Sequence, residues 1–237
     1  MGHIVGILGG MGPLATADLY QKIILATPAS CDQEHLHVVI EADPSVPDRS
    51  AFLHGDGPDP LPALTRGAYR LAAAGVAFIA IPCNTAHAFL PELRARVATP
   101  FLDMVAETAA RVVADYPGVR RVGILATAGT VRMGLYHAAL RERGLEPLHP
   151  DPQAQGLVSA AIAAVKAGDT GPAVGAWLVE AGAALIADGA EVLLTACTEL
   201  PLVLTQAMIS VPLLDPTQVL AEAAVREGRA AHPAGVA

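Results

Sequence analysis

The chain has 237 residues, of which 53% are hydrophobic and 16% charged, with a mean hydropathy of +0.45 and a formal net charge of −8. The negative charge, with no basic stripe and 4% aromatic residues, argues against nucleic acid as a partner. Apolar runs such as Leu71–Pro82 are far shorter than the roughly 20 residues of a membrane span, and the N-terminus has no signal-like core. We therefore expect a soluble, cytoplasmic protein with no membrane partner. Its 3 widely spaced cysteines predict reduced thiols.

Short apolar segments alternate with alanine-rich segments along the chain, a pattern typical of βαβ units and parallel sheets. Strands are predicted at His3–Leu8, Leu36–Glu41, Val76–Ile81, near Phe101, and at Arg121–Ala126, Glu146–His149, Glu191–Thr195 and Val211–Leu214. Helices are predicted at Leu14–Leu25, Leu61–Ala74, Met104–Ala114, Gly134–Arg143, Gly156–Lys166, Gly171–Ala187 and Thr217–Arg226. The C-terminal segment Gly228–Ala237 is expected to be frayed.

Three segments of the first half of the chain have counterparts, in the same order, in the second half. Their spacing is similar, since 77 positions separate Gly6 from Cys83 and 74 separate Gly123 from Cys197. The chain is therefore predicted to contain two copies of one α/β unit; the alternative is a chance alignment of generic strand patterns. The paired segments are VGILGGMG (Val5–Gly12) with VGILATAG (Val122–Gly129), AFIAIPCNT (Ala77–Thr85) with EVLLTACTE (Glu191–Glu199), and TPFLDM (Thr99–Met104) with VPLLDP (Val211–Pro216).

Two of the cysteines occupy matched places in this repeat. Cys83 and Cys197 each follow a predicted strand, and ligands of parallel sheets bind beyond the carboxyl ends of the strands. If two similar lobes face each other, the two thiols are counterparts on opposite walls of one cleft. For either cysteine alone the alternative is packing, because cysteine is among the most buried residue types. Cys31 has no such context and is interpreted as structural.

Two opposed thiols suit the inversion of a carbon centre. One group must remove the α-proton from one face, and another must deliver a proton to the opposite face. A thiolate and a thiol can do this, and a helix N-terminus or a cation lowers the pKa of a thiol. Asn84 or Thr85 is predicted to cap a helix beside Cys83, with Thr198 as the equivalent beside Cys197.

With these residues in view, the chain resembles the cofactor-independent aspartate/glutamate racemase family. The resemblance rests on GILGGMGPLATADLYQKI near the start, VPDRS at Val46–Ser50, IPCNTAH around Cys83 and TACTEL around Cys197. It implies an α/β fold of two pseudo-symmetric lobes, each a small, mostly parallel sheet flanked by helices, with the active site in the cleft between them. It also implies catalysis without pyridoxal phosphate, and commonly a homodimer. The last helix would return to the first lobe, giving domains of residues 1–103 plus 216–237 and of residues 104–215.

The resemblance also assigns roles position by position. Cys83 and Cys197 become the two acid/base residues, and Glu199 stands where the glutamate racemase branch carries a histidine, which favours the aspartate-type branch. Asn84, Thr85 and Thr198 would hold the α-carboxylate and the ammonium group of the substrate. The remaining substrate-binding candidates are Met11, Thr127 and Thr130, which would line the cleft, and Glu199.

The side-chain carboxylate of an acidic substrate needs a cation. Arg49 in VPDRS is the first choice, because a planar guanidinium matches a carboxylate with two hydrogen bonds. Lys166 is the second, since the resemblance implies a lysine at a comparable place. The alternatives are a loop arginine paired with Asp48 or Asp43, and a solvated helix end at Lys166.

No cofactor and no metal are expected. The chain has two lysines, Lys22 and Lys166, and neither has a context typical of a pyridoxal phosphate Schiff base. The sequence HLH (His35–His37) would put two imidazoles on one strand face, but without a further ligand cluster. GMGPLA (Gly10–Ala15) matches a loose dinucleotide fingerprint that explains neither the second glycine turn nor the cysteine pair. His87, one helical turn after Cys83, either tunes that thiol or packs.

These observations predict an amino-acid racemase acting on aspartate, with glutamate as the other candidate substrate. One rival interpretation is a decarboxylase or cis–trans isomerase of a dicarboxylic acid on the same scaffold, although such relatives often keep one of the two cysteines. Another is a non-catalytic protein that binds a small acid.

Overall fold

The computed structural model describes residues 2–230, which form a mixed α/β fold with two parallel sheets flanked by helices. Contacts divide these residues into two compact units. The first unit contains residues 2–47, 59–104 and 217–230, and the second contains residues 48–58 and 105–216. The domain limits given in the sequence analysis stay a prediction.

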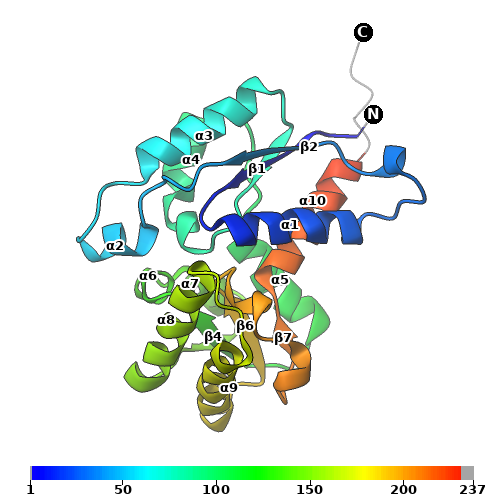
Figure 1. Cartoon of the computed structure of the whole chain (residues 1–237). Coiled ribbons are helices and arrows are strands. Elements are labelled where there is room, and N and C mark those ends of the chain that lie inside the picture. The colour runs from blue at the N-terminus through cyan, green and yellow to red at the C-terminus, as the bar shows by residue number, and fades with distance from the viewer. Residues whose placement is uncertain (1, 231–237) are drawn as a thin grey trace. The chain divides into compact units, whose positions relative to one another are not determined.

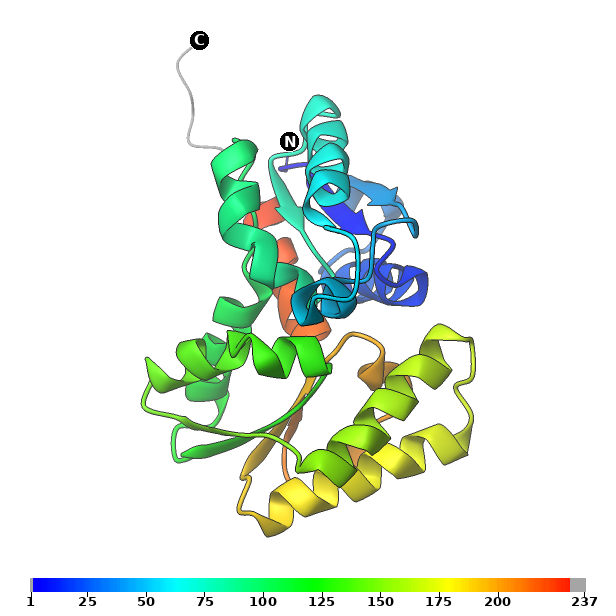
Figure 2. The ribbon, with the colours of Figure 1, turned by 90° about the vertical axis from the view of Figure 1, so that its left-hand side faces the viewer.

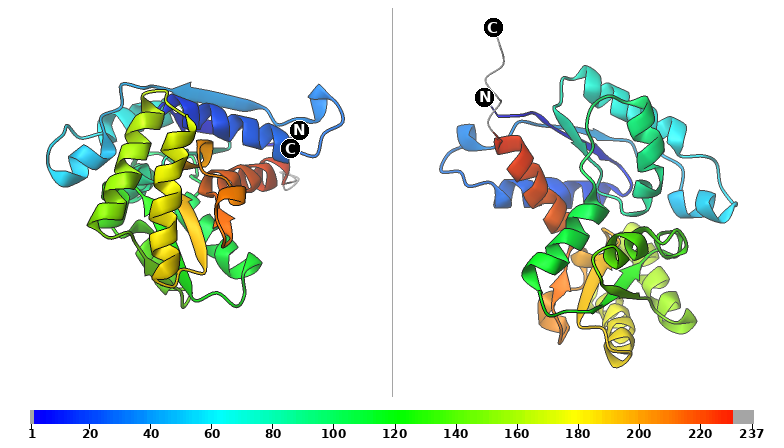
Figure 3. Two further views of the ribbon diagram at one scale, coloured as in Figure 1. Left: turned by 60° about the horizontal axis from the view of Figure 1, so that its bottom comes forward. Right: turned by 180° about the vertical axis from the view of Figure 1, so that it is seen from behind.

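The first sheet has the strand order β2-β1-β3 and is parallel throughout. Its helices cover both faces: α1 and α10 lie side by side on one face, and α3 and α4 lie on the other (Figures 1 and 3). The elements are β1 (Val5–Gly9), α1 (Pro13–Ala26), a 3₁₀ turn (Asp32–Glu34), β2 (Val38–Ala42), α3 (Leu61–Ala73), β3 (Phe78–Ala80), a 3₁₀ helix (Thr85–Phe89), α4 (Leu90–Arg96) and α10 (Pro216–Arg229).

A continuous apolar core explains why the last helix returns to the first sheet. Leu220, Ala221, Ala224 and Val225 share one face of α10, as an amphipathic helix requires, and are buried against the sheet and α1. Helix α10 is therefore distant from the first sheet in sequence, but its apolar side chains belong to the same core as those of the sheet and α1.

The second sheet has the strand order β5-β4-β6-β7, again all parallel. Figure 2 shows α8 and α9 along one face of this sheet, with α5 and α7 on the other, and separate apolar clusters fill the two sides. The elements are α2 (Arg49–His54), α5 (Met104–Asp115), β4 (Arg121–Ala126), α6 (Ala128–Arg132), α7 (Leu135–Arg141), β5 (Glu146–Leu148), α8 (Pro152–Lys166), α9 (Pro172–Ala187), β6 (Val192–Ala196), 3₁₀ turns at Leu200–Leu202 and Gln206–Met208, and β7 (Leu213–Leu214).

The registers of the two sheets confirm the internal repeat. Cys83 lies five positions after the β3 residue that pairs with Val5, and Cys197 lies five positions after the β6 residue that pairs with Val122. A chance alignment of strand patterns would not preserve the pairing, so the two cysteines occupy equivalent sheet positions. The equivalent pairs are Val5 with Phe78 and Val122 with Val192, then Ile79 with Phe101 and Leu193 with Leu213.

The structure corrects several sequence predictions. The second strand begins at Val38 rather than Leu36, because β1 offers pairing partners only from Val5 onward. His35 and His37 therefore precede the strand and are exposed, so they do not share a strand face. The short helices α2 and α6 were not predicted, since five or six residues carry too little periodicity.

The predicted caps next to the cysteines are correct in position at Asn84 and wrong at Thr198. The helix expected after Cys83 starts as the 3₁₀ helix Thr85–Phe89, and Asn84 is its N-cap but makes no capping hydrogen bond through its side chain. Thr198 does not cap the 3₁₀ turn at Leu200–Leu202, because the N-cap there is Glu199, and Pro201 lies in the first turn of this element. In both places the chain turns too tightly for a regular α-helical N-terminus.

The C-terminal helix α10 reaches Arg229, and residues 231–237 of the predicted frayed tail lie outside the described residues. Among residues 2–230, no helix combines the length and apolar composition needed to cross a membrane. In the same part of the chain, no group of three or more His, Cys, Asp or Glu side chains could hold a metal ion.

Candidate functional site

The first cysteine lies in a turn of buried polar residues at the carboxyl end of β3. Cys83 is 6% exposed, and Asn84 and Thr85, which follow it, are buried too. The Cys83 backbone N–H donates to the carbonyl of Ile81, which bends the chain away from the strand. The thiol is therefore held on a rigid turn at the sheet edge where ligands of parallel sheets bind.

His87 holds this turn through the backbone. Its Nε2 accepts a hydrogen bond from the Met104 N–H at 3.1 Å, so Nδ1 carries the ring proton and donates to the Cys83 carbonyl at 2.9 Å. Burial lowers the pKa of His87 and keeps the imidazole neutral, although the nearby Asp103 acts in the opposite direction. Of the two interpretations of His87, these bonds favour a structural role, because the ring contacts the backbone of Cys83.

Met11 lies in the glycine turn after β1, the strand next to β3. Gly10 has a φ of +91°, and a Cβ there would lie 2.3 Å from the Asp43 carbonyl oxygen, so the turn requires glycine. The Gly10 N–H donates to Thr16 Oγ1 at 2.9 Å, and that hydroxyl donates to the Gly12 carbonyl at 2.9 Å. Met11 is thereby fixed and buried at the same edge of the sheet as Cys83.

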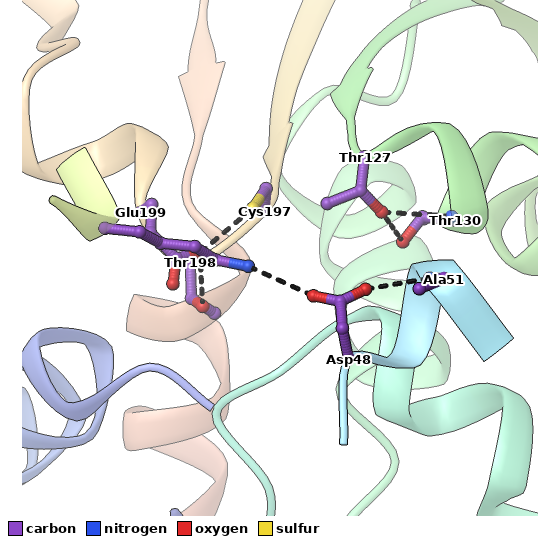
Figure 4. A network of polar contacts seen from close by, with 8 residues as sticks. Asp48, Ala51, Thr127, Thr130, Cys197, Thr198 and Glu199 are labelled. Atoms are coloured by element: carbon purple, nitrogen blue, oxygen red, sulfur yellow. Dashed lines mark hydrogen bonds and ion pairs between the residues drawn. The ribbon is translucent and has the colours of Figure 1, made fainter. Parts of the chain in front are cut away.

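The second cysteine has a carboxylate partner. Cys197 Sγ donates to Glu199 Oε2 at 3.0 Å, and Thr198 Oγ1 donates to the same oxygen at 3.4 Å (Figure 4). All three residues are at most 5% exposed. Glu199 Oε1 is buried as well, with no hydrogen-bond partner among the described residues. In the described part of the chain, the hydrogen-bond donors to the Glu199 carboxylate are therefore the Cys197 thiol and the Thr198 hydroxyl, both at Oε2.

This environment raises the pKa of the Cys197 thiol well above its ordinary value. Burial is the largest cause, followed by the charge of the Glu199 carboxylate and its hydrogen bond from Sγ. The Glu199 backbone N–H and the Lys166 ammonium act in the opposite direction but are outweighed. The expectation that a helix start and a nearby cation would lower the pKa is therefore wrong for Cys197, because burial and the carboxylate dominate.

Thr127 and Thr130 form a second turn at the same sheet edge, because β4 pairs with β6 up to Ala126 and Ala196. Thr127 Oγ1 caps α6 by accepting the Thr130 N–H at 3.1 Å, and the two hydroxyls are 3.1 Å apart. Figure 4 shows both threonines on the turn after β4. Their role as substrate-binding residues stays a prediction.

A close approach of backbones places Arg49 and Asp48 in the second unit. A Cβ on Gly129 would lie 3.0 Å or less from Ser50, so this glycine lets α2 pack closely on α6. Asp48 caps α2 by accepting the Ala51 N–H at 2.8 Å, and Arg49 follows at the first helical position, 7% exposed. The arginine is therefore a buried helix residue rather than an exposed loop residue.

Lys166 ends α8 and lies within 3.8 Å of Asp48 Oδ2, with about a third of its side chain exposed. Burial alone would raise the pKa of Asp48, but the Ala51 N–H and the Lys166 and Arg49 charges outweigh it, and the pKa is lowered. The carboxylate is thus ionised and lies near both predicted cations. Lys166 is not merely a solvated helix end, because it has an acidic partner and its charge also reaches Cys197.

The structure groups the predicted residues by unit. The first unit holds Met11, Cys83, Asn84 and Thr85 at one sheet edge. From the sequence, no role of its own was predicted for Asp48. An Asp can be recognised in a sequence as a candidate helix N-cap, and Asp48 has that role here because it accepts the Ala51 N–H. The second unit holds the other candidates, namely Arg49, Thr127, Thr130, Lys166, Cys197, Thr198 and Glu199.

Comparisons with known proteins find similar chains and structures. The sequence profile of the Asp/Glu/Hydantoin racemase family matches residues 8–224. The broad specificity amino-acid racemase RacX of Bacillus subtilis is 32% identical over 231 residues, covering 94% of this chain and 96% of that protein.

Solved structures give the same result. The aspartate racemase of Picrophilus torridus is 32% identical and superposes with a TM-score of 0.83, covering 96% of this chain and 94% of that one. A glutamate racemase of Francisella tularensis, solved with D-glutamate, is 16% identical with a TM-score of 0.68, covering 94% and 79% of the two chains. At that identity the second structure supports the fold alone.

Proposed function

Because the chain belongs to the Asp/Glu/Hydantoin racemase family, and is thereby an isomerase of the amino-acid racemase type, we propose that it interconverts L- and D-aspartate. Cys83 and Cys197 are the two acid/base residues of this proposal. The observation that carries it is the register of the two sheets, since each thiol stands at the same position after the same strand of a repeated unit. A packing role for either cysteine does not account for that equivalence.

The proposed reaction has two proton transfers. A thiolate takes the α-proton, so that the C–H bond breaks, an S–H bond forms, and the electron pair stays on a planar intermediate. The thiol of the other cysteine then delivers its proton to the opposite face, which forms the new C–H bond and leaves a thiolate. Each half of the cycle therefore restores one thiol and one thiolate, with their positions exchanged.

Substrate recognition follows from the polar groups of the two units. Asn84, Thr85 and Thr198 are proposed to hold the α-carboxylate and the ammonium group by hydrogen bonds. Arg49 and Lys166 are proposed to bind the side-chain carboxylate, since both cations lie in the second unit with Cys197. Their positive charge would also stabilise the negative charge that develops on the intermediate.

Glutamate and other amino acids are the competing substrates. The identity with the Bacillus subtilis racemase of broad specificity equals that with the aspartate racemase, at 32%. Two carboxylates in the second unit, Asp48 and Glu199, also offer partners for cationic groups. A second candidate function is therefore racemisation of a wider range of amino acids.

Solvent-deuterium exchange tests the proposal. The protein is incubated in D₂O with the L and D forms of aspartate, glutamate, alanine and lysine, and both α-deuterium incorporation and enantiomer ratio are followed. We expect exchange and racemisation to be fastest with aspartate. Comparable rates with all four would favour the broader function, and no α-exchange with any of them would favour a decarboxylase, an isomerase of another acid, or a binding protein.

We further propose that the protein works as a homodimer in the cytoplasm. The dimer is an expectation from the resemblance to racemases of this family. Light scattering of the purified protein, measured over a range of concentrations, tests it through the mass of the particle.

A further inference from the structure

We propose that the Glu199 carboxylate is a positioning residue that keeps the proton on the Cys197 thiol in the resting enzyme. On the two-base function proposed above, on which this consequence rests, the resting enzyme then begins turnover with Cys197 as the acid and Cys83 as the base, and turnover of the opposite enantiomer begins from the state with these roles exchanged. Glu199 thereby changes from a substrate-binding candidate to the group that makes the two matched thiols unequal.

The first support is the contact itself. The Sγ atom of Cys197 lies 3.0 Å from Glu199 Oε2, which is short for a hydrogen bond that involves sulfur. The proton of this hydrogen bond is the thiol proton of Cys197. A carboxylic acid is ordinarily about four orders of magnitude more acidic than a thiol, so the shared proton stays on sulfur. Removing it would leave a thiolate and a carboxylate in direct contact.

The second support is burial. Glu199 is 3% exposed and Cys197 is 5% exposed, so water does not screen repulsion between two negative groups. Oε1 has no hydrogen-bond partner within residues 2–230, which leaves the carboxylate dependent on donors at Oε2. The thiol proton and the Thr198 hydroxyl supply those donors, so loss of the thiol proton would remove one of the two.

Two other groups near Cys197 favour its thiolate and would act alone if the Glu199 carboxylate were removed. Within the second unit these are the charged Lys166 ammonium at the end of α8 and the neutral backbone N–H of Glu199. Asp48, which precedes α2, lies against that lysine and offsets part of its charge. A Glu199→Gln substitution keeps the backbone N–H and Lys166 in place while removing the carboxylate, so the thiolate of Cys197 becomes much easier to form.

The first experiment titrates the thiol without using catalysis. In a Cys31→Ser, Cys83→Ser background Cys197 is the single remaining cysteine, and the ultraviolet absorbance of its thiolate is followed against pH. We expect Glu199→Gln to raise the thiolate-to-thiol ratio at a given pH by about tenfold or more, which is one pKa unit. Glu199→Asp, which restores the charge, should return the titration toward the parent, and Lys166→Gln should move it the other way.

The second experiment uses the enzyme with all its cysteines. Racemisation that needs one thiol and one thiolate gives a bell-shaped pH profile, whose alkaline limb marks loss of the acid proton. Glu199→Gln should move that limb to lower pH by about one unit or more, the tenfold change expected above, whereas loss of a merely structural contact would lower the rate without moving the limb.

The two measurements separate the possible failures. If the Cys197 titration is the same in the parent and in Glu199→Gln, the inference about Glu199 is wrong, whatever the protein catalyses. If the titration shifts but the wild-type protein exchanges no α-proton of any amino acid, Glu199 still holds the thiol proton and the two-base function is what fails. Should Glu199→Gln not fold, Glu199→Ala, which also removes the carboxylate, provides the same test, with the same expected rise in the thiolate-to-thiol ratio of Cys197.

Discussion

The two cysteine turns occupy equivalent sheet positions but are held in different ways. At Cys83 an imidazole, His87, fixes the backbone carbonyl, whereas at Cys197 a carboxylate, Glu199, accepts a hydrogen bond from the sulfur itself. The repeat therefore conserves where each thiol stands within its sheet, while the residues that follow each thiol give it a different chemical environment. A repeated fold can thus surround two matched thiols with different chemical groups.

The largest expected effect comes from removing each thiol separately. Cys83→Ser and Cys197→Ser should each lower the racemisation rate by about 10³-fold, because one of the two proton transfers loses its acid/base group. If Cys83 is the resting base, Cys197→Ser retains slow α-exchange with one enantiomer, and Cys83→Ser loses exchange with both. Chiral chromatography and deuterium incorporation measure the two effects.

Cys31→Ser is the control for both variants, since Cys31 is exposed and lies outside both turns. Full racemisation by either Cys83→Ser or Cys197→Ser would remove that cysteine from the mechanism. Equal residual exchange by both variants would instead show that the thiols start in equivalent states.

A smaller effect is expected from the removal of Lys166, one of the two candidate cations of the second unit. Lys166→Met should raise KM for aspartate by about tenfold to 100-fold, the range for a lost hydrogen bond to a charged group, with a smaller change for alanine. Stability should change by less than about 1 kcal/mol, because the pair with Asp48 is partly exposed and screened. Steady-state kinetics and urea denaturation give the two numbers.

Lys22 provides a matched control, because it is the other lysine of the chain and pairs with Asp18 within α1. Lys22→Met should leave KM unchanged. A KM for aspartate that does not rise in Lys166→Met would assign the side-chain carboxylate to Arg49 alone.

At the first turn the expected effect is on stability. His87→Leu removes the imidazole acceptor of the buried Met104 N–H and one of two donors to the Cys83 carbonyl, which still accepts the Ala86 N–H, and this should cost about 1–3 kcal/mol of unfolding free energy. The same substitution at exposed His35 serves as the control and should change stability by less than about 0.5 kcal/mol. Chemical denaturation measures both, and an unaltered stability of His87→Leu would mean that the turn is held by other contacts.

The smallest effect is a dependence of stability on pH. The pKa of His87 is lowered in the folded state by burial, so the unfolded chain binds more protons below the ordinary histidine value of 6.5. Stability should therefore be fully present above about pH 6.5 and fall as the pH drops toward the lowered folded value, by at most about 1.4 kcal/mol per pH unit for this group. His137, whose pKa burial also lowers, contributes with the same sign.

Comparing His87→Leu with the wild-type protein isolates the contribution of His87. The variant should show a shallower loss of unfolding free energy between about pH 6.5 and pH 5, since one buried histidine no longer titrates. Parallel curves for the two proteins would contradict a neutral, buried His87.

The sequence by itself determined the alternation of strands and helices and the placement of two thiols at matched strand ends. Those features depend on short-range patterns: apolar runs such as the one at Arg121–Ala126, which is a strand with the predicted bounds, and a repeated order of glycine turns and cysteines. The residues of each cysteine turn were also found, because they are neighbours along the chain.

Only the tertiary structure decided what those residues contact. The packing of α2 on α6 depends on a glycine–serine approach between Gly129 and Ser50, positions that no local pattern connects. The raised pKa of Cys197 depends on burial and on the orientation of the Glu199 side chain, and a sequence specifies neither directly. Residue order locates the chemical groups, but burial and side-chain direction, which set their proton affinities, arise only when distant segments pack together.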